Sequence, residues 1–437
     1  MVRKFQMFFA PNILSNILST FPYDKWKLRI IFSIVLSYAT YYVTRLNFSF
    51  AIPSLVYEFG FTKTQIGLVL SAFSIVYGLG KFFSGIASDI TSAKKIIMTG
   101  LLGTALINLI VPSITTIWFL AIIWGINGCF QAMGWPPCVR LINNWFHKNE
   151  IGTVWGLCNS AHAIGSSFIG IIAGILLSTF NWKALFYLPA AIAFIVLLNL
   201  TNHLDEYPNH KNRIQGKNNN KNLHANNAKS LSYGNIIFEK LLKSSIVWSM
   251  ALGTMFLYVI RVGLLNWLPT FLIEHNHNMN SVGWQFSTLE FLGIFGGIAA
   301  GYISDKVGYI HRSKVAMTLI FGLIICIGAF IILPQDCLLL KNAAIMLFGF
   351  FIYGPQVLAG IIANDYASKS IAAAVTGFIG TFGYIGATFA GIGLGIIADK
   401  FGWSGLFITL FISSIACFLC FLTANHHSSK TKSTEEL

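Results

Sequence analysis

The chain has 437 residues, of which 55% are hydrophobic and only 10% are charged. Soluble domains carry about 25% charged residues, so this composition excludes an ordinary water-soluble enzyme and indicates a membrane protein. The 29 Lys and Arg against 15 Asp and Glu give a formal charge of +14, which in a soluble protein would suggest nucleic-acid binding. In a membrane protein, an excess of Lys and Arg is expected because these residues concentrate in the cytoplasmic loops. We therefore expect no nucleic-acid partner.

Twelve apolar stretches are long enough to cross a bilayer as helices, which takes about 20 mostly apolar residues each. They lie at 28–52, 64–87, 96–113, 114–142, 152–178, 183–201, 246–272, 282–303, 315–334, 341–364, 370–397 and 403–424. Residues 202–245 are rich in Asn, Lys and His and indicate a solvated linker. We therefore predict an all-α membrane protein with two six-helix bundles, 28–201 and 246–424, and cytosolic tails at 1–27 and 425–437.

The two predicted bundles are copies of one sequence repeat. Seven pairs of identical residues lie 216 positions apart: Tyr42/Tyr258, Arg45/Arg261, Pro53/Pro269, Glu58/Glu274, Gly85/Gly301, Ser88/Ser304 and Asp89/Asp305. An offset of 221 pairs Trp182 with Trp403. Two parallel six-helix repeats are the architecture of the major facilitator fold, which we expect here.

The positions of Lys and Arg predict the orientation in the membrane. With both termini in the cytoplasm, 22 of them lie on the cytoplasmic side, four lie on the opposite side and three lie inside spans. Cytoplasmic loops of membrane proteins carry such an excess of basic residues. We therefore expect a multi-pass protein with both termini in the cytoplasm. The richness in Asn, Lys and Ile suggests an AT-rich bacterial genome, and thus a bacterial inner membrane.

Two intramembrane arginines form the strongest functional signal. A charge at the bilayer centre costs roughly 2.5–3.5 kcal/mol on insertion scales, so such residues indicate a functional site. Arg45 and Arg261 occupy equivalent repeat positions, and two facing guanidinium groups suit one multivalent anion. The alternative is that each arginine pairs with a carboxylate. Glu290 is the carboxylate that falls well inside a span, and it cannot neutralise three cations, so the core keeps a charge of about +2.

Lys81 is the third intramembrane cation. It continues a polar stripe with Ser74 and Tyr77 along one helix face, which predicts a position in a cavity lining with Glu290 as its partner. The alternative is a lysine that snorkels to the cytosolic interface near Asp89.

Other polar residues recur at helical spacing in the predicted spans. Tyr42 lies in the first span, Asn159 and His162 in the fifth, and Tyr258 in the seventh. When it is protonated, His162 can donate a hydrogen bond to phosphate. The alternative is that this lone intramembrane histidine only forms a hydrogen bond between helices. The site prediction includes Tyr353 and Tyr384, for which the alternative is aromatic packing.

The sequence predicts two structural latches and no metal site. The segments GIASD and GYISD end in Asp89 and Asp305 beside basic residues at cytosolic helix ends, which suggests inter-helix latches with a gating role. Seven cysteines lie in or at the ends of apolar segments without zinc-site spacing. We interpret them as packing residues and expect neither a cofactor nor a metal.

Beyond these residues, the chain resembles the organophosphate:phosphate antiporter family of the major facilitators. The resemblance is carried by YYVTRLNFSFAIPSL (41–55), YGLGKFFSGIASD (77–89), FQAMGWPPCVR (130–140), CNSAHAIG (158–165), YVIRVGLLNWLPTFL (258–272), IYGPQ (352–356) and GFIGTFGYIGA (377–387). It implies that Arg45 and Arg261 clamp phosphate with assistance from His162. It also implies a cavity lined by Lys81, Tyr42, Tyr77, Tyr258 and Trp135.

Within that family the substrate signals point in two directions. The segments at 130–140, 261–272 and 382–384 look most like those of members that carry glycerol-3-phosphate. In addition, Thr376 and Ile379 stand where hexose-phosphate carriers have an Asp and a Lys. By contrast, GPQVLAGIIANDYASK (354–369) looks more like hexose-phosphate sensors and transporters. Two departures are Leu46, where the glycerol-phosphate carrier has lysine, and Asn266, where it has aspartate; together they suggest a deleted ion pair.

These features predict a secondary transporter that exchanges an organophosphate, with glycerol-3-phosphate favoured, for inorganic phosphate by alternating access. It is expected to act as a monomer in the lipid bilayer. The alternatives are a hexose-6-phosphate antiporter and a sugar-phosphate sensor that does not transport. A membrane phosphatase would need a nucleophile or metal cluster, and the spans contain no His-rich or Asp-rich constellation, so we do not expect an enzyme.

Overall fold

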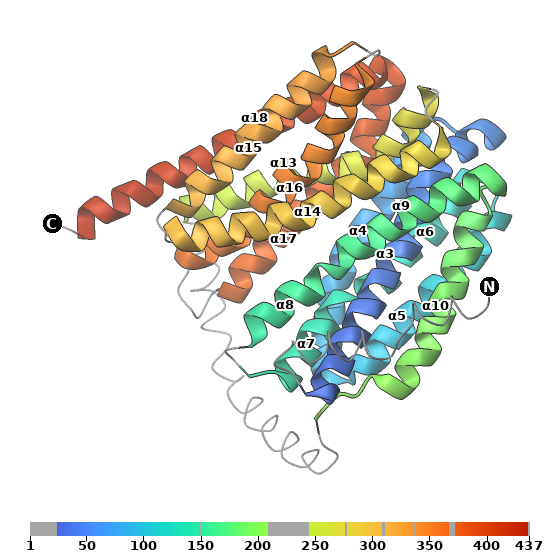
Figure 1. The fold of residues 1–437 in the computed structure, drawn as a ribbon, viewed down its shortest axis with the longest axis horizontal. Helices are drawn as coiled ribbons and strands as arrows, with labels where there is room; N and C mark the ends of the chain where they lie inside the picture. The colour runs from blue at the N-terminus through green and yellow to red at the C-terminus, as the bar shows by residue number, and fades with distance from the viewer. Residues whose placement is uncertain are drawn as a thin grey trace, which may run out of the picture.

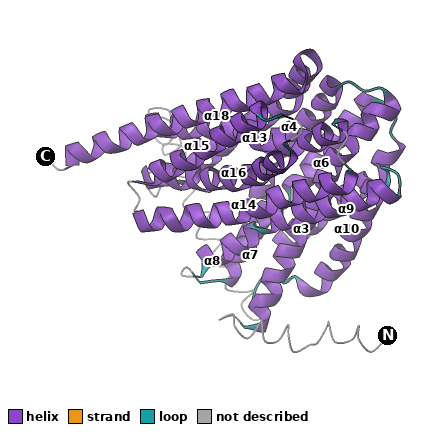
Figure 2. Cartoon of the chain, turned by 45° about the horizontal axis from the view of Figure 1, so that its top comes forward, coloured by secondary structure: helices purple, strands orange, loops and turns teal. Residues whose placement is uncertain are grey.

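The structure is a computed structural model that describes residues 24–147, 150–208, 244–275, 278–307, 311–334, 337–366 and 372–435. Within these ranges every regular element is a helix and there is no strand, as Figure 2 shows. The predicted linker and the predicted N-terminal tail lie mostly outside these residues, and the domain boundaries stay predictions.

The first half of the chain supplies the helices that carry Arg45 and Lys81. They are α3 (Lys25–Phe59), α4 (Lys63–Ile90), α5 (Ala93–Ile110) with the turn η1 (Val111–Ser113), α6 (Ile117–Ala132), α7 (Trp135–Trp145), α8 (Ile151–Asn159), α9 (Ala161–Thr179) and α10 (Ala184–His203). α4 begins with a capping box in which Thr62 and Gln65 exchange side-chain to backbone hydrogen bonds.

The second half supplies Arg261. Its helices are α13 (Ser245–Glu274), α14 (Met279–Val307), α15 (Arg312–Ile332), α16 (Leu338–Tyr366), α17 (Ala372–Thr388), the π-helical segment η5 (Phe389–Gly393) and α18 (Leu394–Glu435). α18 contains a kink at Gly402, whose φ of 65° is favourable for glycine, and this kink separates the last two predicted spans.

Each of the twelve predicted stretches is helical in the described residues. Among the described residues, ten segments are long and apolar enough to cross a membrane by length and composition, and one of them, Val375–His426, contains two predicted spans. The helix α3, which contains the first predicted span, is not among these ten. The structure corrects the prediction in detail. The fourth span breaks after Ala132 and the fifth breaks at Ser160, and α18 continues to Glu435 instead of ending at 424.

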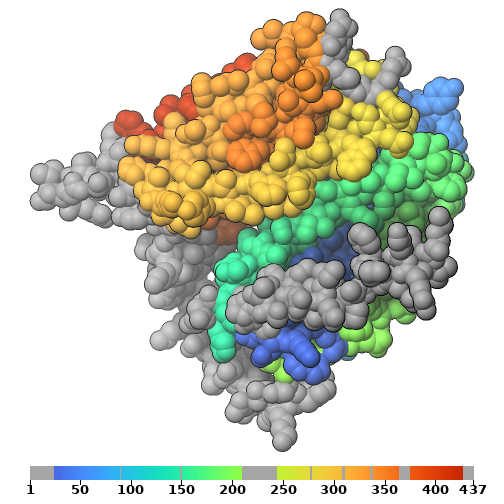
Figure 3. All heavy atoms as spheres, in the orientation of Figure 1, coloured from blue at the N-terminus to red at the C-terminus, as the bar shows by residue number. Residues whose placement is uncertain are grey.

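The two halves lie side by side. In Figure 1 the blue to green helices occupy one side and the yellow to red helices the other, with α9 running along α14. Figure 3 shows the same two helices in contact along the boundary between the halves. Glycines allow this approach, because a Cβ on Gly170 would lie 3.0 Å from the carbonyl oxygen of Gly283.

A second contact joins α4 to the segment around η5. The Ser71 hydroxyl donates to the Thr388 carbonyl at 2.6 Å and accepts from the Ile392 amide at 2.8 Å. The Trp267 indole of α13 donates to the Ala390 carbonyl at 2.9 Å. These bonds partner backbone groups of the π-helical segment, a type of local distortion frequent at functional sites.

One end of the molecule, which we call the latched face, carries polar contacts that repeat between the halves. The Trp182 indole donates to Glu58 at 2.5 Å, and the Trp403 indole donates to Glu274 at 2.7 Å. These are the repeat pairs found in the sequence, so the two copies share a structural detail as well as residues. Lys63 of the first half also forms a 3.0 Å salt bridge with Glu274 of the second half.

Asp399 completes the latched face. Its carboxylate accepts hydrogen bonds from the Lys63 amide at 3.1 Å, the Thr64 amide at 2.7 Å and the Thr64 hydroxyl at 2.6 Å. The residue therefore caps the N-terminus of α4 from the other half, where a negative charge is favourable. Asp399 and Lys63 hold the halves together at this end.

Candidate substrate site

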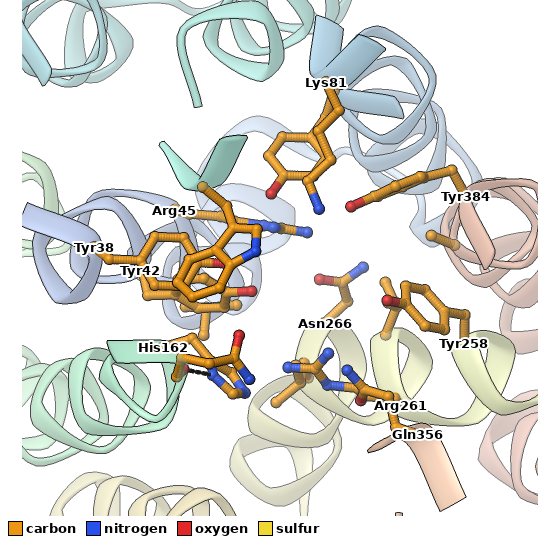
Figure 4. A pocket seen from close by; sticks show the side chains of 17 residues that line it. Tyr38, Tyr42, Arg45, Lys81, His162, Tyr258, Arg261, Asn266, Gln356 and Tyr384 are labelled. Carbon is orange, nitrogen blue, oxygen red and sulfur yellow. Dashed lines mark hydrogen bonds between the residues drawn. The ribbon is translucent and has the colours of Figure 1, made fainter. Parts of the chain in front are cut away.

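A cavity of about 130 Å³ lies between the two halves, and residues from both line it (Figure 4). Its lining consists of Tyr38, Tyr42, Arg45, Leu46, Tyr77, Lys81, Trp135, Asn159, His162, Tyr258, Arg261, Val262, Leu265, Asn266, Gln356, Tyr384 and Ala387. Three of these residues are cationic and none is Asp or Glu. The lining thus has an uncompensated positive charge suited to an anion.

Arg45 of α3 is held in the cavity by aromatic rings. Its guanidinium carbon lies 4.8 Å from the ring centres of both Phe73 and Tyr77, and 5.6 Å from that of Tyr42. Such cation–π contacts orient the group and leave its N–H donors available. In the described part of the chain no carboxylate pairs with Arg45, so the alternative of a simple ion pair does not hold for this residue.

Arg261 of α13 is held by a hydrogen-bonded chain behind the cavity. It donates to the Tyr353 hydroxyl at 3.0 Å, and that hydroxyl lies 2.8 Å from both carboxylate oxygens of Glu290, which is completely buried. Tyr353 is not part of the cavity lining, contrary to the prediction, and its hydroxyl connects the arginine to Glu290. It supports Arg261 instead.

Lys81 of α4 lines the cavity but does not have the predicted partner. Its ammonium lies 5.5 Å from the ring centre of Tyr77 and 5.4 Å from that of Tyr384, and Figure 4 shows Lys81 next to Tyr384. Glu290 bonds to Tyr353 on the far side of Arg261, so the expected Lys81–Glu290 pair is wrong. The prediction failed because sequence spacing does not give the position of α14 relative to α4.

His162 lies just after the break between α8 and α9. Its Nδ1 contacts the Asn159 carbonyl oxygen, the bond dashed in Figure 4. A carbonyl only accepts, so Nδ1 is the donor, and Nε2 is the ring nitrogen without a partner among the described residues. The neighbouring break after Ala132 brings Trp135 into the lining in the same way. The two helix breaks therefore place side chains in the cavity.

The structure also shows residues that the site prediction omitted. Tyr38 precedes Tyr42 by one helical turn and was not included, and Leu46 and Asn266 were named only as departures from the family, yet all three line the cavity. Gln356 follows Gly354 and Pro355 in α16 and carried no periodic signal. Leu46 and Asn266 also share a small adjoining pocket with Arg45, which is consistent with a deleted ion pair at this point.

The two predicted latches lie away from the cavity. Arg312 of α15 forms a 3.1 Å salt bridge with Asp305 of α14, an inter-helix contact of the predicted kind. Asp89 lies in α4, but its side chain is outside the described residues.

Comparisons with known proteins agree with this architecture. A sequence profile of the Major Facilitator Superfamily matches residues 31–391. The glycerol-3-phosphate transporter of Bacillus subtilis is 36% identical, over 93% of this chain and 94% of that protein. The probable hexose phosphate transport protein of Chlamydia pneumoniae is 33% identical, over 94% of each. The membrane sensor protein UhpC of Escherichia coli is 29% identical, over 90% of each.

Solved structures match the fold over nearly the whole chain. A bacterial homologue of the human lysosomal transporter Spinster, in an inward-facing and occupied conformation, superposes with a TM-score of 0.73 at 14% identity, over 94% of this chain and 98% of that one. The nucleoside transporter NupG superposes with a TM-score of 0.73 at 15% identity, over 92% and 100%.

The chain belongs to the major facilitator superfamily and, within it, to the organophosphate:phosphate antiporter family. It is a multi-pass membrane protein with the major facilitator fold. This membership places it among membrane transport proteins rather than enzymes.

Proposed function

We propose that the protein exchanges an organophosphate for inorganic phosphate, with the phosphate group held between Arg45 and Arg261. The observation that carries the proposal is that two repeat-equivalent arginines and Lys81 line one cavity without a carboxylate. An uncompensated charge of this kind favours a ligand of charge about −1.5 to −2, which is that of a phosphate monoester near pH 7. Such a ligand interacts with both halves at once.

The contacts between the halves support alternating access as the proposed mechanism. The hydrogen bonds between the halves gather toward the latched face, from Lys63–Glu274 to Ser71–Thr388 and the reciprocal pair Ser167–Ser287. With both termini in the cytoplasm, the latched face is external, and we propose that the cavity opens toward the cytoplasm in this conformation. Transport then requires these contacts to open while others form at the cytoplasmic end.

The size of the cavity favours a small organophosphate. Engineered cavities near 150 Å³ accommodate a benzene-sized ligand, and this cavity measures about 130 Å³. Inorganic phosphate fits such a volume, and glycerol-3-phosphate needs less expansion of the cavity than hexose-6-phosphate does. Glycerol-3-phosphate is therefore the proposed substrate, and hexose-6-phosphate is the second candidate because a hexose-phosphate relative covers the same length of chain.

Uptake of labelled phosphate into phosphate-loaded proteoliposomes tests the function. We expect exchange that external glycerol-3-phosphate inhibits at lower concentration than glucose-6-phosphate, and that neutral glycerol does not inhibit. The reverse order of the two organophosphates would assign the hexose-phosphate alternative. No exchange by folded protein that still binds a sugar phosphate would overturn transport and favour a sensor.

A further inference from the structure

We propose that the side-chain amides of Asn266 and Gln356 bind the hydroxyl groups of the organic part of the substrate and set the specificity of the cavity. This inference rests on the proposed function. It adds a second chemical zone beside the phosphate clamp. The substrate class is accordingly a phosphorylated polyol or sugar rather than any phosphate monoester.

The two amides have unused hydrogen-bonding capacity. Asn266 of α13 is 8% exposed and Gln356 of α16 lies in the same lining. In the described part of the chain Asn266 has no hydrogen-bond partner, and the buried Oε1 of Gln356 has none either. The buried Oε1 of Gln356 without a partner carries a free-energy penalty. A bound ligand that supplies partners removes this penalty.

The chemistry of the missing partners distinguishes a hydroxyl from a phosphate oxygen. The cationic groups of the cavity are all donors, and an ionised phosphate oxygen only accepts. The Oε1 of Gln356 is an acceptor, so it requires a donor. A hydroxyl group both donates and accepts, which matches the two functions of an amide. The amide zone is therefore suited to an alcohol.

The placement of the amides agrees with a ligand that extends from the clamp. Figure 4 shows Gln356 beside Arg261, and it shows Asn266 between the side chains of Arg261 and Lys81. The Nε atom of Arg261 also lacks a partner. A substrate whose phosphate contacts the guanidinium groups thus has its carbon chain within the neighbourhood of both amides, whereas inorganic phosphate has no atoms to reach them.

Inhibition of phosphate:phosphate exchange separates the two zones. The variants are Asn266→Leu and Gln356→Leu, which keep approximate volume, and Asn199→Leu in α10 is the control outside the lining. The probes are glycerol-3-phosphate, glucose-6-phosphate and n-propyl phosphate, which has no free hydroxyl. We call the stronger inhibitor of glycerol-3-phosphate and glucose-6-phosphate the hydroxylated probe. In wild type we expect this hydroxylated probe to inhibit exchange more strongly than n-propyl phosphate does.

In each lining variant we expect the half-inhibitory concentration of the hydroxylated probe to rise about fivefold, the effect of one neutral hydrogen bond. The half-inhibitory concentration of n-propyl phosphate is expected to rise less, so the ratio of the two concentrations increases. In the Asn199→Leu control, both concentrations and the KM for phosphate are expected to stay within about twofold of wild type. Unchanged discrimination between the hydroxylated probe and n-propyl phosphate would overturn the inference, as would an equal loss for phosphate itself. Absence of phosphate exchange in wild type would instead refute the proposed function.

Discussion

At the scale of single residues, the two arginines of the clamp are equivalent in sequence but supported differently. Arg45 lies against three aromatic rings, whereas Arg261 donates to Tyr353, which in turn contacts the buried Glu290. Aromatic rings orient a guanidinium without neutralising it. The carboxylate behind Arg261 offsets part of its charge, so we expect Arg45 to supply more of the attraction for phosphate.

Replacing Arg45 by lysine tests the need for a guanidinium fork. Lysine keeps the charge but loses bidentate geometry, and losing one charge-assisted hydrogen bond costs about 1.5–3 kcal/mol. We expect Arg45→Lys to raise the KM for phosphate exchange at least tenfold. The control is Arg140→Lys, outside the cavity lining, with an expected change below twofold. Equal behaviour of the two variants would contradict the clamp.

Replacing Tyr353 by phenylalanine tests the support behind Arg261. The change removes the hydroxyl between the guanidinium and Glu290 and leaves a buried carboxylate with one partner fewer. We expect a loss of stability of about 1–3 kcal/mol, seen as a lower Tm, and a weaker affinity for phosphate. Tyr187→Phe, at a 45% exposed position, serves as the control. An unchanged Tm and affinity in Tyr353→Phe would show that the hydrogen-bonded chain has no such role.

At the scale of secondary-structure elements, helix breaks and helix termini carry the functional geometry. Trp135 and His162 enter the cavity at breaks within the fourth and fifth spans. The N-terminus of α4 is capped by Asp399 from the opposite half. Partial charges at helix ends favour such contacts, and a contact between halves must open during transport.

Removal of the Asp399 cap is expected to weaken the latched face. Loss of a capping side chain costs about 0.5–2 kcal/mol, so Asp399→Ala is expected to shift the equilibrium toward the opposite conformation about fivefold. Spin labels at Tyr57 and Phe401, which are 93% and 70% exposed on this face, would measure it by double electron–electron resonance.

We expect a longer distance population to grow in Asp399→Ala relative to wild type. Asp205→Ala is the matched control, because Asp205 interacts with Arg29 of the same half. A distance distribution in Asp399→Ala that is the same as in wild type would contradict a latch at this residue.

At the scale of the whole molecule, hydropathy and the internal repeat predicted the twelve helical stretches and the fold class. They also placed Arg45, Arg261 and Lys81 among candidates that line one cavity. The helical stretches, the fold class and these three cations could be predicted because helix periodicity and the repeat are visible in the amino-acid sequence itself.

Contacts between helices from different parts of the chain were not predictable in this way. The expected Lys81–Glu290 pair failed because the angle between α4 and α14 is set by packing, and Tyr353 was placed in the lining for the same reason. Gln356 gave no periodic signal, because a single amide among apolar residues has no period, and it appeared only as the last residue of the IYGPQ segment. Helix breaks were missed because hydropathy averages across them.

Efflux of labelled phosphate from loaded proteoliposomes tests the central claim most directly. An antiporter with one site for both substrates moves phosphate out only when a substrate enters. We predict negligible efflux into medium that contains no phosphate compound or only neutral glycerol, and rapid efflux when glycerol-3-phosphate is added outside. Equal efflux under all conditions, or none with glycerol-3-phosphate and glucose-6-phosphate, would contradict the exchange of phosphate for an organophosphate.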